Sequence, residues 1–154
     1  MVDPMRRLTF DTPTGPFTLT QKDGAIVRAE WDSGGVDETP VLCAARDQVG
    51  EYFAGTRRVF DLPLAVEGSE FQVRVCDAMS AIPLGETRTY GDLARQLGVP
   101  AQAVGQGCGG NPIPVIIPCH RVLGANGLGG FSGRGGVETK VWLLRHEGAA
   151  GLLI

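Results

Sequence analysis

The sequence lacks any long apolar run. None of its hydrophobic stretches approaches the roughly 20 residues that a membrane-spanning helix needs. The first residues, 1–7, contain no apolar stretch of the kind found in signal peptides. With 43% hydrophobic residues among 154, the chain has enough apolar side chains for a core of ordinary size. We therefore expect a globular protein of the cytoplasm, with one domain or two small ones and no membrane contact.

The sequence also lacks any Cys-x-x-Cys pair. Its cysteines, Cys43, Cys76, Cys108 and Cys119, stand far apart, which argues against a zinc knuckle and against a thioredoxin-type redox motif. We expect four free thiols, of which all but Cys119 fill space as small buried hydrophobic side chains. No metal and no cofactor are predicted.

An excess of positive charge, the usual mark of a nucleic-acid-binding protein, is missing as well. The formal net charge is −3, and it is unevenly distributed along the chain. Residues 1–67 contain 7 Lys/Arg against 11 Asp/Glu, whereas residues 68–154 contain 7 against 6. Only the second part of the chain is therefore suited to face phosphates.

The pattern of residues 1–67 predicts a small antiparallel sheet covered by a helix. Apolar and polar residues alternate over 8–10, 17–19 and 27–31, and turn sequences separate these segments. Thr39-Pro40 begins a helix that ends near Gly55. Its predicted buried face consists of Val41, Ala45, Val49 and either Tyr52 or Phe53.

Residues 68–154 are predicted to form a second, mostly helical domain. Ser69-Glu70-Phe71-Gln72 matches a capping box at the start of a helix. Thr89 caps a short helix, and Pro100 begins another that ends near Gly107. Two short helices joined by a glycine-containing turn indicate a helix-turn-helix. The fold class is therefore α/β (α+β), with a boundary near residue 68.

The second of these short helices is rich in glycine, with four glycines among residues 101–110. Glycine lowers intrinsic helix stability. Its use here implies that a neighbour approaches the backbone closely. That neighbour is either another part of the protein or the floor of a DNA groove, and the sequence leaves both open.

The segment from Asn111 to Val122 ends in a cysteine beside two basic side chains. Its three prolines fix φ and remove backbone donors, so we expect an extended, largely buried track. His120 and Arg121 follow Cys119 and are candidates for raising its thiolate fraction. Adjacent side chains on an extended chain point to opposite sides, so proton transfer to His120 is expected to pass through a water.

A third group is needed to orient the histidine, and Glu147 is the candidate. It follows His146 at the end of the last predicted helix, whose buried face is marked by Val137, Val141 and Leu144. A carboxylate that accepts the imidazole N–H holds its tautomer and stabilises the imidazolium. Spacing alone does not separate this triad from a surface helix end and a buried structural cysteine.

The string Pro118-Cys119-His120-Arg121-Val122, preceded by Asn111-Pro112-Ile113-Pro114, resembles the active-site signature of the O6-alkylguanine-DNA alkyltransferases, or methylated-DNA-protein-cysteine methyltransferases. The resemblance covers residues 69–148 well and the earlier part more loosely, through its strands and Tyr52-Phe53-Ala54-Gly55. It implies an RNase H-like domain over 1–67 and a winged-helix-like alkyltransferase domain over 68–154. It also implies a single-turnover transfer of an alkyl group from O6-alkylguanine, and from O4-alkylthymine, in double-stranded DNA to Cys119. Because that reaction requires no second subunit, we expect a monomer.

The resemblance gives each site residue an expected role. Cys119 accepts the alkyl group, His120 deprotonates it through a water, Glu147 orients His120, and Asn111 holds the turn. Tyr90 rotates the phosphate of the target nucleotide. The substrate pocket is expected from Pro114, Leu128, Gly129, Phe131 and Ser132. The DNA-binding residues are expected to be Ala101, Gln102, Ala103, Gly105, Gly109 and Arg121.

The sequence departs from the family pattern at three places. Most members carry an arginine where Gln102 stands, so we expect less filling of the space left by the flipped base and weaker duplex binding. Many relatives have a tyrosine where Phe131 stands, which removes one hydrogen-bond donor to the purine. The turn Gly98-Val99-Pro100 is about two residues shorter than in relatives, which could tilt the second helix.

Two other functions stay open on the sequence. A lesion-binding sensor of the alkyltransferase-like type lacks the acceptor cysteine, whereas Cys119 is present here. A cysteine-dependent transferase or hydrolase acting on a small molecule is compatible with Gln102 and with the acidic overall charge.

Overall fold

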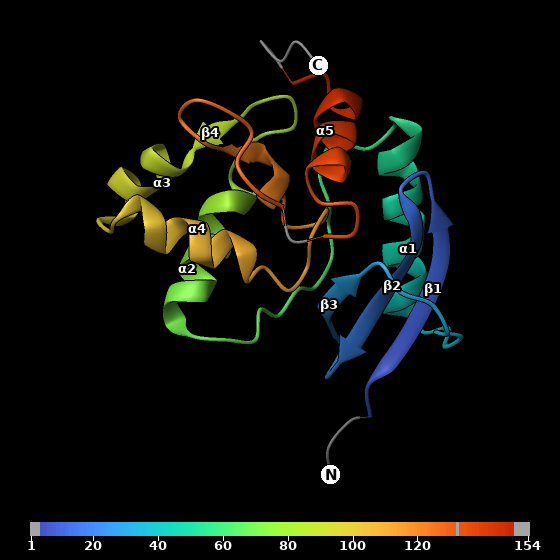
Figure 1. Ribbon diagram of the computed structural model, residues 1–154. Helices are drawn as coiled ribbons and strands as arrows, with labels where there is room; N and C mark the ends of the chain where they lie inside the picture. The colour runs from blue at the N-terminus through green and yellow to red at the C-terminus, as the bar shows by residue number, and fades with distance from the viewer. Residues whose placement is uncertain (1–3, 132, 150–154) are drawn as a thin grey trace. The chain divides into compact units, whose positions relative to one another are not determined.

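The computed structural model describes residues 4–131 and 133–149, and the chain divides into two compact units, Met1–Glu67 and Gly68–Ile154. Both units mix helices with short antiparallel or parallel strands, so the chain is a mixed α/β protein (Figure 1). Within the described ranges no helix is long and apolar enough to cross a membrane.

The first unit is built on a three-stranded antiparallel meander, as predicted. Its strands are β1 (Arg6–Thr12), β2 (Gly15–Lys22) and β3 (Ala25–Glu30), with β2 in the centre. Leu8 lies opposite Leu19, and both are buried. Thr18 is buried as well. Its hydroxyl is satisfied there, since it lies 2.6 Å from the Thr9 hydroxyl and donates to the Asp32 carbonyl at 2.8 Å. The polar side of β2 is therefore part of the core.

Helix α1 (Pro40–Ala54) packs against all three strands of this sheet. The Thr39 hydroxyl accepts from the Leu42 amide, and Gly55 ends the helix at φ 81°, in the left-handed region where glycine is favoured. The predicted buried face was wrong at its first position. Leu42, and not Val41, is buried together with Ala45, Val49 and Tyr52.

In its described residues, the second unit contains four α-helices and a two-stranded parallel pair. The helices are α2 (Glu70–Ser80), α3 (Tyr90–Leu97), α4 (Ala101–Gly109) and α5 (Val137–His146). Strands β4 (Arg88–Thr89) and β5 (Val122–Leu123) pair beside the short 3₁₀ helix η1 (Cys119–Arg121). Helix α4 packs against α2 and α3, so two neighbours fix its position.

Two details of the helices differ from the sequence predictions. Ser69 caps α2, but the predicted capping box was wrong, because Nε2 of Gln72 donates to the Gly107 carbonyl of α4 at 2.8 Å. The buried residues of α5 are Lys140, Leu143 and Leu144, whereas Val137 is 43% exposed. The buried face of α5 therefore includes a lysine, whereas the sequence pattern predicted only apolar residues there.

The segment before Cys119 is buried as predicted, but it is a folded loop and not an extended track. Asn111 closes it from inside: its Oδ1 accepts from the Ile113 amide at 3.0 Å and its Nδ2 donates to the Ile117 carbonyl at 2.8 Å. Val115 has φ 73°. This clamp delivers Cys119 at the first residue of η1, so Cys119 and His120 lie on a helical turn.

Candidate active site

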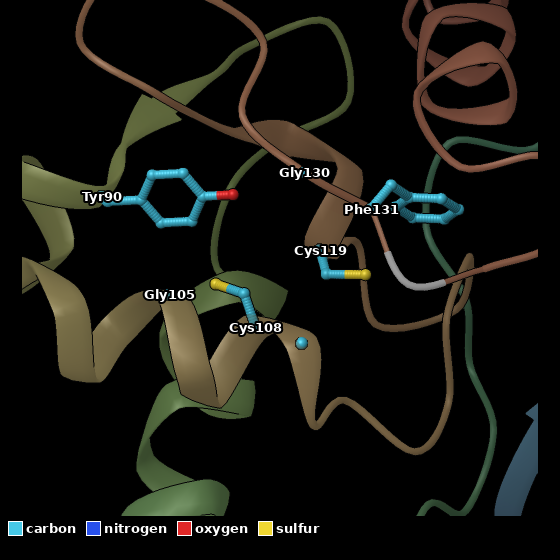
Figure 2. A pocket seen from close by; sticks show the side chains of 7 residues that line it. Tyr90, Gly105, Cys108, Cys119, Gly130 and Phe131 are labelled. Atoms are coloured by element: carbon cyan, nitrogen blue, oxygen red, sulfur yellow. The ribbon is translucent and has the colours of Figure 1, made fainter.

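The Cys119 side chain lies at a cavity of about 430 Å³ in the second unit. Only 6% of this residue is exposed, so the thiol is shielded from bulk water while it still lines the cavity. Figure 2 shows the Cys119 sulfur on the Phe131 side of the cavity and the Cys108 sulfur on the Tyr90 side. The lining residues are Tyr90, Gly105, Cys108, Gly109, Cys119, Gly130 and Phe131.

Next to the cysteine, His120 is completely buried and touches Glu147. Its Nε2 lies 2.5 Å from Oε2 of the carboxylate, which stands at the end of α5. The structure thus brings together the two residues that the sequence paired across 27 positions. The other ring nitrogen, Nδ1, has no hydrogen-bond partner among the described residues.

Arg121 completes this group and does not face outward. Its Nε and Nη2 donate to the two oxygens of Glu147 at 2.8 and 3.1 Å, and its Nη1 donates to the Ile82 carbonyl at 2.7 Å. Only 6% of Arg121 is exposed. The prediction that Arg121 binds DNA was therefore wrong, because its guanidinium is committed to a buried carboxylate and a carbonyl.

Burial and pairing set the charges of the site. Burial alone would raise the pKa of Glu147, but the hydrogen bonds and charges of His120 and Arg121 lower it to about 2. Burial lowers the pKa of His120 and outweighs the opposite effect of Glu147. Burial also raises the pKa of Cys119, against the hydrogen bond from Asn111 and the charge of Lys140. At neutral pH, the resting site therefore holds a carboxylate, a neutral imidazole and a thiol.

Lys140 is a charged residue of the site that sequence reasoning missed. It is fully buried on α5, and its Nζ donates to the Val122 carbonyl at 2.7 Å and to the Gly130 carbonyl at 3.0 Å. The same Nζ lies 5.8 Å from the centre of the Tyr90 ring. Its charge lowers the pKa of both Cys119 and Cys108. The spacing of Lys140 with Leu143, Leu144 and Glu147 on one helix face was the signal that could have found it.

The residues predicted for the substrate pocket take different positions in the structure. Tyr90 and Phe131 line the cavity, whereas Pro114, Leu128 and Gly129 do not. Gly129 instead packs directly against Tyr90, since a Cβ on this residue would lie 2.8 Å from the phenol ring. Its φ of 73° also lies in the region that favours glycine. Ser132 lies outside the described residues. Cys108 and Gly130 also line the cavity, although neither was predicted as a site residue.

The four glycines in α4 and at its C-terminal cap divide into two sets. A Cβ on Gly107 would lie 2.8 Å from Val75, and one on Gly110 would lie 2.6 Å from Gln72, so these two glycines allow close packing inside the protein. A Cβ on Gly105 or Gly109 would meet nothing within 4 Å, although both residues line the cavity. Internal packing therefore explains only half of this glycine content.

The other predicted DNA-binding positions lie along the same helix. Ala101 and Gln102 are exposed, and Ala103 is half-buried. In the described part of the chain no group of three or more His, Cys, Asp or Glu residues is arranged to hold a metal ion.

A buried cysteine whose neighbouring histidine is held by a glutamate, at the wall of a cavity, defines a protein with a cysteine nucleophile. The family model "6-O-methylguanine DNA methyltransferase, DNA binding domain" matches residues 70–149. The chain belongs to this family, and the expectation drawn from the Pro-Cys-His-Arg string is confirmed.

Similarity extends over both units. The chain is 43% identical over 150 residues to a methylated-DNA-protein-cysteine methyltransferase of Mycolicibacterium paratuberculosis, which covers 90% of each chain. It is 38% identical over 154 residues to the constitutive Bacillus subtilis protein of that name, covering 90% of this chain and 93% of the other. A crystal structure of Mycobacterium tuberculosis OGT in complex with DNA matches with a TM-score of 0.82, 38% identity and 92% coverage of both chains.

Proposed function

We propose that this protein repairs double-stranded DNA by moving an alkyl group from O6-alkylguanine to Cys119, once per molecule. The observation that carries the proposal is the contact between His120 and Glu147 next to a thiol that lines a cavity. O4-alkylthymine is the second expected substrate, because it presents the same alkyl–oxygen bond on a smaller base.

The first step is removal of the thiol proton. Nδ1 of His120 is the ring atom without a partner among the described residues, so it accepts the proton, through a water. The imidazolium that forms is stabilised by Glu147, which is already ionised. Arg121 keeps that carboxylate fixed and prevents it from taking the proton itself.

The second requirement is a stable thiolate. Burial disfavours the negative charge on Cys119, and Lys140 is the cation that offsets this cost. Lys140 also donates to the carbonyls of Val122 and Gly130. Through Gly130 it fixes one wall of the cavity, so the same side chain positions the wall and favours the nucleophile.

In the transfer itself, the Cys119 sulfur attacks the alkyl carbon and the carbon–oxygen bond to guanine breaks. The electron pair of that bond leaves with the base, which then takes up a proton. Hydrogen-bond donors at the cavity wall, such as the Tyr90 hydroxyl, stabilise the departing base. The product is a thioether, which water does not hydrolyse under physiological conditions, so the reaction stops after one event.

The substrate base has to leave the duplex to reach this cavity. Extrusion costs a few kcal/mol, and less for a damaged pair. Gly105 and Gly109 leave open space at the cavity beside α4, where a sugar–phosphate backbone can approach. In this assignment α3 and α4 form the helix-turn-helix, Ala101, Gln102 and Ala103 enter the minor groove, and Tyr90 rotates the target phosphate.

We also assign each of the two units to a domain type. Residues 1–67 form an RNase H-like domain and residues 68–154 a winged-helix-like domain that carries the reaction. The protein acts as a monomer, since one molecule contains every residue that the mechanism uses, and its expected compartment is the cytoplasm.

The test is transfer from a duplex oligonucleotide that contains O6-methylguanine, followed by mass spectrometry. Trypsin leaves Cys108 and Cys119 in one peptide, residues 96–121, so fragment ions have to separate the two sulfurs. We expect methylation of Cys119, its loss in Cys119→Ser, and its retention in Cys108→Ser. Binding of the lesion without transfer indicates a sensor, and repeated turnover with unmodified Cys119 indicates a small-molecule enzyme. Either result contradicts the proposal.

A further inference from the structure

The outward face of α4 carries two glutamines and no charged residue. Gln102 and Gln106 are four residues apart, so they share one face of the helix, and both are exposed. Neither side chain makes a hydrogen bond to any residue that the structure describes. Two amide groups are thus presented to the outside by a helix that offers phosphates no positive side chain.

The helix that carries this face also borders the cavity of Cys119. Gly105 and Gly109 line the cavity, and Gln106 lies between them in the chain. The opposite side of α4 is occupied, because Gly107 packs on Val75 and its carbonyl accepts from Gln72. Gln106 therefore lies on the exposed side of the helix segment that borders the cavity, and Gln102 lies one helical turn closer to the start of α4.

The separation of the two glutamines along the helix is close to two base-pair steps. Four residues advance a helix by about 6 Å. Successive base pairs are about 3.4 Å apart. When Gln102 lies at the position of an extruded base, Gln106 therefore lies one to two pairs away along the duplex.

We propose that Gln106 reads the minor-groove edge of a base pair within two steps of the extruded nucleotide. This inference rests on the proposed function. The 2-amino group of guanine is the donor that distinguishes G·C from A·T in the minor groove. Oε1 of Gln106 accepts from that amino group, so the protein reacts faster at lesions flanked by G·C pairs.

The experiment removes one hydrogen-bond partner at a time. Two duplexes carry O6-methylguanine flanked by G·C pairs or by inosine·C pairs, which lack only the 2-amino group. Wild-type protein is compared with Gln106→Met, which keeps the side-chain length and the helix propensity but has no amide. Gln102→Met is the matched control on the same face, and the rate of Cys119 methylation is measured with substrate below saturation.

We expect wild-type protein to react about fivefold more slowly on the inosine duplex, the effect of losing one hydrogen bond of ordinary strength. Gln106→Met should react at equal rates on the two duplexes, and Gln102→Met should keep the wild-type ratio. Wild-type protein and Gln106→Met should react equally with free O6-benzylguanine, which requires no DNA contact.

Several results overturn the inference. An inosine effect of the same size in Gln106→Met and in wild-type protein shows that duplex stability, and not Gln106, causes it. If Gln106→Met also reacts more slowly than wild-type protein with O6-benzylguanine, Gln106 has a structural role and does not act by reading a base pair. A wild-type protein that does not methylate Cys119 at all contradicts the proposed function, and this outcome is distinct from the other two.

Discussion

Nε2 of His120 lies 2.5 Å from Oε2 of Glu147, and neither side chain is exposed to solvent. The same carboxylate accepts two hydrogen bonds from Arg121. One buried negative charge is therefore held between a titratable ring and a permanent cation. The arrangement leaves the Nδ1 side of His120 for proton transfer from Cys119.

Replacing Glu147 by glutamine should slow alkyl transfer strongly. The amide keeps the shape of the side chain but cannot stabilise an imidazolium, so we expect a loss of roughly 100-fold or more in the rate with O6-benzylguanine. Arg121 would also lose its buried counter-ion, which costs about 3–5 kcal/mol of unfolding free energy. Both quantities are measured beside Glu138→Gln, an exposed position on α5. Unchanged activity in Glu147→Gln would remove this residue from the mechanism.

The free energy of unfolding should fall as the solution is acidified. The pKa of Glu147 is lowered in the folded protein from 4.5 to about 2. A depressed carboxyl pKa stabilises the fold above the unfolded value and loses this effect as pH falls from about 4.5 toward 2. The loss is on the order of 3 kcal/mol. His120, whose pKa is also lowered, adds acid sensitivity that begins near its ordinary value of 6.5.

Urea denaturation between pH 7 and pH 3 measures this dependence. Glu147→Gln should show a flatter profile below pH 4.5 than wild-type protein. Parallel profiles for the two proteins would assign the acid sensitivity to other groups.

Removing the charge of Lys140 should shift the reaction toward higher pH. Its ammonium lowers the pKa of Cys119, so Lys140→Met raises that pKa and reduces the thiolate fraction near pH 7. We expect a larger rate deficit at pH 7 than at pH 9 with O6-benzylguanine. Lys140→Arg, which keeps the charge, should restore part of the neutral-pH rate. A deficit that is independent of pH would indicate that Lys140 acts only through the carbonyls of Val122 and Gly130.

The two sets of glycines in α4 should respond differently to alanine. Gly107→Ala places a Cβ 2.8 Å from Val75 and should destabilise the protein. Gly105→Ala meets nothing within 4 Å and should stabilise the helix by roughly 0.5–1 kcal/mol. The same Gly105→Ala protein should react more slowly with duplex DNA, because the methyl group stands at the cavity. Equal activity with duplex and with free base would remove Gly105 from the DNA contact.

Introducing arginine at position 102 should strengthen duplex binding. Gln102 is exposed on the uncharged face of α4, so Gln102→Arg adds a cation without disturbing a buried contact. We expect a faster reaction with duplex substrate, a steeper dependence on salt and an unchanged rate with O6-benzylguanine. A variant that reacts no faster with the duplex contradicts the view that glutamine weakens this contact.

The sequence predicted the parts of the molecule that local rules control. The β1–β2–β3 meander follows from alternation and turn residues, and the starts of α1 and α3 follow from capping by Thr39 and Thr89. The pairing of His120 with Glu147 could be proposed from the need of a buried imidazole for a carboxylate.

Other features depend on contacts that no local pattern encodes. Arg121 was expected at DNA on the family resemblance, but a buried carboxylate and the Ile82 carbonyl hold it inside. Lys140 was missed because lysine is rarely buried, and its burial here depends on carbonyls 10 and 18 residues away. The positions of Pro114 and Leu128 off the cavity wall follow from how their loops fold, which composition does not determine.

The most direct test of the account is the amount of methyl bound per protein at increasing excess of O6-methylguanine duplex. Intact-protein mass spectrometry should show one added methyl group at every excess, located on Cys119 by fragmentation, with no further product released after the first equivalent. A protein that releases several equivalents of repaired DNA, or that carries the methyl group on Cys108, would contradict a single buried acceptor thiol activated by His120 and Glu147.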